Sequence, residues 1–370
     1  MRGPLFTSRP NYPRSASRPW SCLPTVRGPS VWRVQNPSAP VTAFPKLMNN
    51  PTISVCIPTH DRPNMLSEAL ESIMVQTLPP SEVVVSDNYG DSATAAVVAS
   101  FASRSNFPVR LIHCQHRDSP VENFNNAFKA AFGDLIVLLH DDDLLYPGAL
   151  KALVEPFLQV EDLVASYGLQ MKVTSSGEEL ESEPLNRAFA RVPQEAGLKT
   201  DSLRSAVLGQ FPNIGFMVRA SVAKAVLYDP NYGGACDVEF GVRCASHGPF
   251  YFVPVWTSKY RLSTDSLSRG RGRKTEDAGY HFVRLCLEML DNSAPCEQEL
   301  KLRLRKQISV GLLQAATLGH THTAVSWLLG PYHRRQLLTL PGAARAFYVA
   351  LACLRVRRPL WKSAKELQPG

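Results

Sequence analysis

From Pro51 onward, short apolar runs alternate with stretches of helical periodicity, and this alternation restricts the possible folds more than any other feature. The apolar runs predict strands at 53–57, 82–86, 109–113 and 135–139, and the helical periodicity predicts helices at 63–76, 92–102, 122–132 and 147–158. Further strands are expected at 164–168, 215–219 and 250–255. Strands that alternate with helices at this spacing form a parallel, doubly wound α/β sheet.

The apolar run at 135–139 ends in His140 and three consecutive carboxylates, Asp141, Asp142 and Asp143. Adjacent carboxylates repel one another and resist burial, so they are tolerated where a cation gathers them. Hard divalent cations prefer oxygen ligands, and ligands of open α/β sheets bind at the carboxyl ends of strands. A metal or ligand site is one interpretation of this cluster, and a solvated acidic loop is the other.

Polar clusters also follow the first and second predicted strands, at 58–63 and 86–92. Because parallel strands end at the same edge of a sheet, we expect both clusters to meet the acidic cluster at 140–143 in one crevice. Any one of them could be ordinary turn chemistry, but three in register argue for a shared site. The chain has no Gly-x-Gly-x-x-Gly after the first strand and no Walker lysine, which disfavours a Rossmann dehydrogenase, a P-loop enzyme and a nucleotidyltransferase.

Several motifs together resemble glycosyltransferase family 2, an inverting family with the GT-A nucleotide-diphospho-sugar transferase fold. The matching stretches lie between residues 51 and 268 and are Val55-x-Ile-Pro-Thr-x-x-Arg62, Asp87-Asn-x-x-x-Ser92, Asn125 to Gly133-Asp134, the acidic cluster with Leu-Leu-Tyr-Pro-Gly-Ala-Leu150, Gly233-Gly-Ala-Cys-Asp237, Arg243, and Val253 to Arg261. The resemblance implies a GT-A domain over 51–265 with a doubly wound, mostly parallel sheet, followed by a C-terminal helical extension.

The resemblance also implies roles for residues at the strand ends. Side chains expected to bind a nucleotide-sugar donor are Pro58, Thr59, Asp61, Arg62, Asp87, Asn125 and Asp141. Asp87 would accept a hydrogen bond from a pyrimidine N3–H, which selects uracil or thymine over cytosine. Asp142 and Asp143 would bind Mn²⁺ or Mg²⁺, which neutralises the departing nucleoside diphosphate. His140 stands where the first acid of the family motif often lies. Three roles for His140 stay open: a contact with the ribose, a structural contact and a metal contact. Asp141 is a candidate to make the contact that the first acid of the motif makes in the family.

An inverting transferase needs one general base near the anomeric carbon. The family places an acid at the start of a helix after the sheet, where this chain reads Cys-Asp-Val-Glu at 236–239. Asp237 is the expected base, and Glu239 is the alternative. The competing interpretation of Asp237 is structural: an acid at the start of a helix that the helix dipole stabilises. Arg243 and Arg261 are expected to contact phosphate, to position the helix or to pair with acids.

The two ends of the chain differ in charge from its middle. Residues 1–47 hold seven Lys/Arg, no acid and nine prolines, residues 48–300 hold 21 basic and 31 acidic residues, and residues 301–370 hold 12 basic residues and one acid. We expect residues 1–50 to be a disordered leader or an extension ahead of a true start at Met48.

C-terminal to the catalytic domain, we expect a linker at residues 266–277 and a basic helical extension at residues 278–370. Aromatic residues at helical spacing precede a basic cluster within 343–365, a pattern typical of a helix that lies on an anionic membrane surface. The alternative is a helix packed on the catalytic domain with a solvated basic tail. No recognisable motif supports a nucleic-acid partner.

Eight scattered cysteines without a Cys-x-x-Cys pair favour a reduced, cytosolic protein. The absence of a Gln-x-x-Arg-Trp motif disfavours a processive polymerase. We therefore expect a metal-dependent inverting glycosyltransferase that moves one sugar from a UDP- or dTDP-sugar to a glycan or lipid-linked acceptor, as in cell-surface polysaccharide synthesis. It would act in the cytoplasm or peripherally on the cytoplasmic face of the membrane. The alternative, suggested by His140 and Cys236, is a catalytically inactive nucleotide-sugar- or glycan-binding protein of the same fold.

Overall fold

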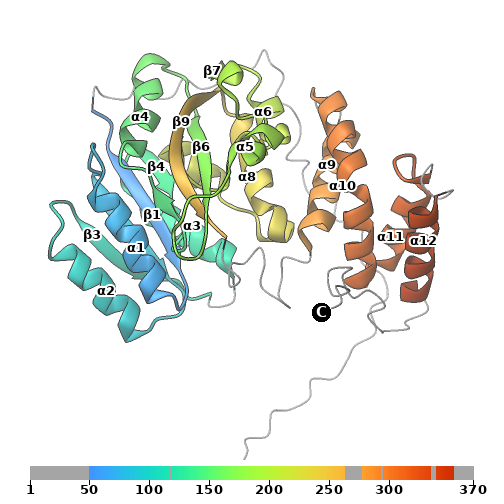
Figure 1. Ribbon diagram of the computed structural model, residues 1–370, viewed down its shortest axis with the longest axis horizontal. Coiled ribbons are helices and arrows are strands. Elements are labelled where there is room, and N and C mark those ends of the chain that lie inside the picture. Colours follow the sequence, from blue (N-terminus) through green and yellow to red (C-terminus); the bar gives the residue numbers. More distant parts are fainter. Residues whose placement is uncertain (1–49, 117–118, 263–276, 293–294, 335–338, 354–370) are drawn as a thin grey trace, which may run out of the picture. The chain divides into compact units, whose positions relative to one another are not determined.

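The computed structural model describes residues 50–116, 119–262, 277–292, 295–334 and 339–353 (Figure 1). Its strands are β1 (Ile53–Thr59), β2 (Glu82–Asp87), β3 (Val109–His113), β4 (Leu135–Leu138), β5 (Leu144–Leu145), β6 (Ala165–Val173), β7 (Gly197–Lys199), β8 (Phe216–Arg219) and β9 (Phe250–Arg261). Its helices are α1 (Pro63–Met74), α2 (Ser92–Ala102), α3 (Pro120–Ala130), α4 (Ala149–Gln159), α5 (Glu183–Ala188), η1 (Pro193–Glu195), α6 (Ser202–Leu208), α7 (Ala220–Val226), η2 (Pro230–Ala235), α8 (Cys236–Ala245), α9 (Ala278–Asp291), α10 (Glu297–Thr317), α11 (Thr321–Leu329) and α12 (Leu340–Cys353).

Three predicted segments fall largely outside these residues. They are the leader up to residue 49, the linker up to residue 276, and the basic tail after residue 353. The boundaries of the predicted domains therefore stay predictions.

In the described part of the chain, nine strands form one sheet in the order β3-β2-β1-β4-β8-β6-β9-β5, with β7 paired to β9. β3, β2, β1 and β4 run parallel, as the alternation of strands and helices predicts. β8 is antiparallel to both of its neighbours, β4 and β6, so the strand expected at 215–219 does not continue the parallel series. β6 and β9 again run parallel to one another, whereas β5 and β7 run against β9.

The chain reaches β8 from β6 through a long connection that contains α5, β7 and α6. Asn186 of α5 accepts a hydrogen bond from the Gln170 N–H at 3.1 Å and donates one to the Gln170 carbonyl at 2.9 Å. These bonds hold α5 beside the carboxyl half of β6. After α5, β7 pairs with the start of β9 at the opposite edge of the sheet, and α6 follows. The chain then enters β8 at the carboxyl end of β4, where the Gly215 N–H donates to the Leu138 carbonyl at 3.3 Å, and β8 runs antiparallel to β4. Short helices such as α5 carry too little periodicity to be predicted from the sequence.

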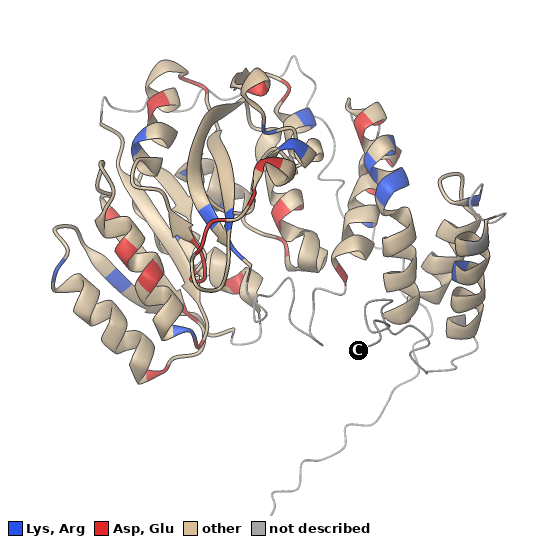
Figure 2. Ribbon diagram, in the orientation of Figure 1, with Lys and Arg blue, Asp and Glu red and all other residues tan. Residues whose placement is uncertain are grey.

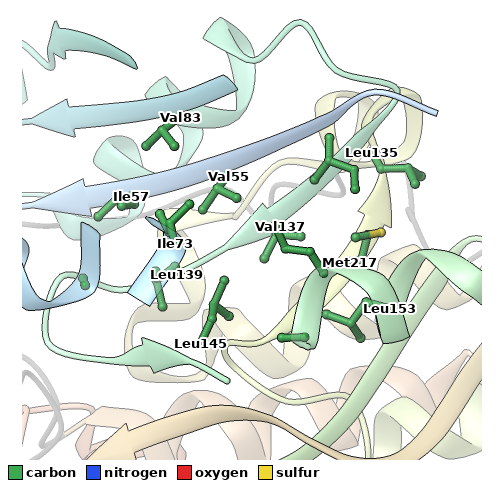
Figure 3. Packing of buried hydrophobic residues seen from close by; sticks show 14 of the residues in the cluster. Val55, Ile57, Ile73, Val83, Leu135, Val137, Leu139, Leu145, Leu153 and Met217 are labelled. Atoms are coloured by element: carbon green, nitrogen blue, oxygen red, sulfur yellow. The ribbon is translucent and has the colours of Figure 1, made fainter. Parts of the chain in front are cut away.

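The main core lies between the sheet and the helices on one of its faces (Figure 3). Val55 and Ile57 of β1 and Val137 and Leu139 at β4 are fully buried there, because alternate residues of a strand point to the same face. α1 covers them with an apolar stripe formed by Leu66, Ala69, Leu70 and Ile73. Each fully buried side chain of the Val, Leu or Ile type contributes about 1.5–3 kcal/mol. The core thus fixes β1 and β4 side by side, so their carboxyl ends lie together.

The C-terminal helices contact η2 and α6 through α9 and α10. Tyr232 donates a hydrogen bond to Glu288 at 2.5 Å, and Arg204 pairs with Glu299 at 2.9 Å. Figure 2 shows Lys and Arg residues on α10, in line with a basic extension. The predicted membrane-facing helix corresponds to α12, where the Phe347 side chain is 64% exposed. Among the described helices, none is both long enough and apolar enough to cross a bilayer.

Candidate active site

The carboxyl ends of β1, β2 and β4 meet at one edge of the sheet, as predicted. Thr59 and Asp87 are register partners at the ends of β1 and β2. The Thr59 hydroxyl and the His60 N–H donate to the Asp141 carboxylate at 2.9 and 3.3 Å. Asn123 of α3 supports this corner, because its amide donates to the Thr59 carbonyl at 3.0 Å. Polar clusters that are distant in the sequence therefore share one crevice.

Arg62 lies against the acidic cluster. Its Nη1 is 3.3 Å from Asp141 Oδ1 and 3.1 Å from Asp142 Oδ2, and both carboxylates are buried. Burial raises the pKa of Asp141, the charge of Asp142 adds to this, and Arg62 opposes it. One guanidinium thus compensates only part of the charge of two buried carboxylates, and the remaining negative charge favours a cation.

Arg261, the last residue of β9, fixes the acidic cluster from the other side. Its N–H donates to Asp143 Oδ1 at 2.8 Å, and its Nε donates to the Asp142 carbonyl at 2.9 Å. Its two terminal nitrogens donate to the Ser175 carbonyl at 2.7 Å and to the Glu68 carboxylate at 2.5 Å. Because every guanidinium nitrogen is bound to protein, the structure favours pairing and positioning over the phosphate contact that was also considered for Arg261.

His140, Asp142 and Asp143 form a compact set of candidate metal ligands. One side-chain atom of each lies within 4.8 Å of the others. His140 Nδ1 is 3.5 Å from Asp143 Oδ2, at the outer limit of a hydrogen bond. This buried oxygen has no hydrogen-bond partner among the residues that the structure describes, and burial raises the pKa of Asp143 to about 6. An unsatisfied carboxylate oxygen beside a nitrogen and further oxygens is a donor set that a divalent cation fits.

A cavity of about 440 Å³, within the usual range of small-ligand sites, opens beside the ends of β2 and β3. It is lined by Asp87, Asn88, Tyr89, Gly90, His113, Cys114 and Gln115. The Asp87 oxygens accept from the Tyr89 N–H at 2.8 Å and from the Gly90 N–H at 3.0 Å. Since each carboxylate oxygen has a second lone pair, Asp87 can still accept a hydrogen bond from a base. The segment after β3 was not predicted as part of the site, although the same strand-end rule points to it.

Pro58 and Asp61 lie in different surroundings. Pro58 is buried within β1, and the contact with a donor that is expected of it stays a prediction. Asp61 is exposed and has a φ of 51°. Left-handed backbone is uncommon outside glycine, although Asp tolerates it better than most residues, and such residues gather at functional sites.

Asn125 has a structural task in place of the donor contact expected from the sequence. Its Nδ2 donates to the Tyr228 carbonyl at 2.8 Å, and its Oδ1 accepts from the Tyr228 N–H at 2.7 Å. Asn125 is buried, and this pair of bonds ties α3 to the segment that leads into η2. The side chain is therefore committed to the fold.

Asp237 and Glu239 stand in the first turn of α8 but face different partners. Asp237 is half-buried, and its Oδ1 accepts from the Val238 N–H at 2.8 Å. Burial raises the pKa of Asp237, and the charge of His140 opposes this rise. Glu239 is buried, with both oxygens bound to the Arg243 guanidinium. Glu239 and Arg243 therefore form an ion pair within α8, which is the pairing with an acid that was considered for Arg243.

Comparison with known proteins agrees with this geometry. Residues 54–199 match the family model Glycosyl transferase family 2. This stretch of the chain therefore resembles glycosyltransferase family 2. It is 31% identical over 105 residues to GalNAc(5)-diNAcBac-PP-undecaprenol beta-1,3-glucosyltransferase of Campylobacter jejuni, covering 28% of this chain and 34% of that protein. It is 34% identical over 114 residues to the uncharacterized glycosyltransferase YwdF of Bacillus subtilis, covering 31% of this chain and 41% of that protein. The matches thus span about a third to two fifths of the length of these relatives.

Solved structures extend the likeness beyond the family 2 domain. The structure of S. aureus TarS 1-349 in complex with UDP-GlcNAc aligns with a TM-score of 0.55 at 16% identity and covers 81% of both chains. The complex of the same protein with UDP gives a TM-score of 0.52 at 14% identity and covers 85% of this chain and 94% of that one. The prediction of a GT-A fold with a mixed, mostly parallel sheet and C-terminal helices is confirmed.

Proposed function

We propose that this protein is a metal-dependent inverting glycosyltransferase that moves a single sugar from a UDP- or dTDP-sugar to an acceptor hydroxyl. The observation that carries this proposal is the crevice in which the acidic cluster and the Asp87 cavity meet at the ends of β1, β2 and β4, and we propose Asp237 as the base beside it. A nucleotide-sugar offers one matching group to each: a diphosphate, a pyrimidine and a reacting sugar. The TarS complex with UDP-GlcNAc supports a donor of this class.

The roles follow from the contacts. Asp87 would accept from the base N3–H, while Thr59, Asp61, Arg62 and Asp141 would line the ribose and diphosphate. When bound, Mn²⁺ or Mg²⁺ would supply Lewis-acid neutralisation of the leaving diphosphate, held by Asp142 and Asp143.

Asp237 would take the proton of the acceptor hydroxyl as its oxygen attacks the anomeric carbon. The bond from that carbon to the phosphate oxygen breaks on the opposite face, so the nucleoside diphosphate leaves and the configuration inverts. We assign this role to Asp237 and not to Glu239, because both oxygens of Glu239 are bound to Arg243.

For the acceptor we propose a glycan or a lipid-linked glycan. The name of the Campylobacter jejuni relative describes a sugar chain on a polyprenol diphosphate as its acceptor. Such an acceptor would place the enzyme peripherally on the cytoplasmic face of a membrane, with the basic segment 343–365 against anionic lipid.

A panel of nucleotide-sugars with Mn²⁺ tests the donor class. We expect release of UDP or dTDP from at least one donor, and weaker binding of CDP than of UDP. Asp87→Asn should reduce the discrimination between UDP and CDP, because it removes an acceptor for N3–H. If UDP-sugars bind with the expected selectivity but are never turned over with any acceptor, the inactive binding protein becomes the better account.

A further inference from the structure

His140 is the residue at which the acidic cluster departs from the pattern of its family, and the structure shows what surrounds it. We propose that His140 is a direct metal ligand through Nδ1, together with Asp142 and Asp143 Oδ2, and that this nitrogen makes the site prefer Mn²⁺ over Mg²⁺. The inference rests on the proposed function only in taking the metal to lie where a donor diphosphate binds.

The first support is the unsatisfied oxygen of Asp143. Asp143 is 1% exposed, its Oδ1 accepts from the Arg261 N–H, and its Oδ2 has no hydrogen-bond partner among the described residues. A buried carboxylate oxygen left without a partner is costly, and a metal ion satisfies it. The 3.5 Å between this oxygen and His140 Nδ1 is near the separation of about 3 Å between adjacent ligands on a small divalent ion.

The second support is the fixed orientation of the His140 ring. It stacks on Phe124 of α3 with ring centroids 5.4 Å apart and an interplanar angle of 13°. Phe124 is itself held edge-on by Tyr228 at 5.3 Å. A ring fixed by neighbouring aromatic residues presents Nδ1 to Asp143 without further ordering, which is what a metal ligand needs.

The third support comes from elimination within the acidic cluster. Asp141 already receives hydrogen bonds from the Thr59 hydroxyl and the His60 N–H, in addition to the contact with Arg62 that it shares with Asp142. These two bonds fix its carboxylate at the end of β1. His140, Asp142 and Asp143 are left as the group whose ligand atoms gather.

The preference for Mn²⁺ follows from the nitrogen. Mg²⁺ is a hard ion that favours oxygen ligands and retains water, whereas imidazole suits transition metals. One competing arrangement has the same geometry: a protonated His140 acts as the cation beside Asp143. In that case the chain would need no metal at this position. Direct measurement of metal binding separates the two arrangements.

The test uses the full-length chain with UDP and Mn²⁺. Pulsed electron paramagnetic resonance of bound Mn²⁺ detects a coordinated imidazole through its ¹⁴N coupling, and titration followed by competition with Mg²⁺ gives the affinity ratio. His140→Asp supplies an all-oxygen donor set, His140→Asn is a second variant, and His322→Asn, an exposed histidine of α11, is the matched control.

We expect ¹⁴N coupling in the wild type and in His322→Asn, and none in either His140 variant. His140→Asp should still bind both ions, with the Mn²⁺ preference reduced at least about tenfold, the lower end of the loss seen when even an outer-shell partner of a metal ligand is removed. Coupling that persists in His140→Asp would overturn the assignment. Wild-type protein that binds Mn²⁺ but shows no ¹⁴N coupling would also overturn the assignment. This result does not depend on the folding of any variant.

The outcomes also separate this inference from the proposed function. Mn²⁺ bound with ¹⁴N coupling, but no turnover of any nucleotide-sugar, would overturn the proposed function and support the ligand assignment. Metal-dependent turnover without ¹⁴N coupling would do the reverse. Turnover in chelator by a chain that binds no Mn²⁺ would overturn the ligand assignment in favour of the protonated His140.

Discussion

Replacing Asp237 by Asn removes the proposed base while keeping the shape of the side chain. The amide oxygen can still accept the bond that the Val238 N–H donates at 2.8 Å, so the start of α8 should form as before. The lost charge at this helix N-terminus costs about 0.3–1 kcal/mol of stability. Transfer should fall by about 10²–10⁴-fold, the contribution of a positioned general base. That fall corresponds to about 3–5 kcal/mol in the activation barrier.

Glu239→Gln is the matched variant, two residues along the same helix. Both oxygens of Glu239 bind Arg243, which also donates to the Leu227 carbonyl at 2.6 Å. Removing one partner of a buried ion pair costs about 3–5 kcal/mol, since the other charge stays buried. At roughly 2–4 °C per kcal/mol, the melting temperature should fall by roughly 6–20 °C. The transfer rate per folded molecule should stay within a few-fold of the wild type.

Both variants are measured by thermal melting, by donor affinity in a binding titration and by transfer rate on folded protein. We expect Asp237→Asn to lose rate and keep stability and donor affinity, and Glu239→Gln to lose stability and keep rate. The opposite pattern would refute the assignment and move the base to Glu239. If both variants transfer at wild-type rates, the base lies elsewhere and the proposed site geometry is wrong.

Three further predictions follow from contacts in the crevice. Asp142→Ala should abolish Mn²⁺-dependent turnover and weaken Mn²⁺ binding, and wild-type turnover of this variant in chelator would contradict the role of Asp142. Burial raises the pKa of Asp237 above its ordinary value of 3.8, and a general base must be ionised to act. As the pH is lowered at saturating metal, the transfer rate should therefore begin to fall at a higher pH than it would with an exposed aspartate as base. A transfer rate that stays constant until the chain unfolds would count against this role. Asn125→Ala should lower stability by about 2–4 kcal/mol, because it leaves the buried N–H and carbonyl of Tyr228 unpaired, while donor affinity per folded molecule stays unchanged. Weaker donor binding at full stability would return Asn125 to the donor site.

Much of the fold is readable from the sequence because strand and helix periodicities are regular between residues 51 and 159. β1, β2, β3, β4 and the helices between them lie within a few residues of the predicted bounds. The same rule fails at β8. Its apolar sequence contains no sign of direction, and the path of the chain between β6 and β8 depends on tertiary contacts such as the bonds from Asn186 to Gln170.

The candidate site shows a similar division. The convergence of Thr59, Asp87 and the acidic cluster follows from strand order, which the sequence encodes. The sequence does not show whether a given polar side chain faces the crevice. Asn125 and Glu239 match family motifs and yet are bound to Tyr228 and Arg243, because hydrogen-bond partners are chosen by packing in three dimensions. His113 belongs to the cavity through the end of β3, a position that its residue type alone does not mark.

Release of UDP from a UDP-sugar is the measurement that tests the central claim most directly. With the donor identified and an acceptor glycan present, we predict turnover by the wild type in Mn²⁺, none in chelator, recovery when Mn²⁺ is returned, and none in Asp142→Ala at any Mn²⁺ concentration. A chain that binds no nucleoside diphosphate, or one that releases UDP equally well in chelator and in Asp142→Ala, would contradict the claim that this crevice is a metal-dependent glycosyltransferase site.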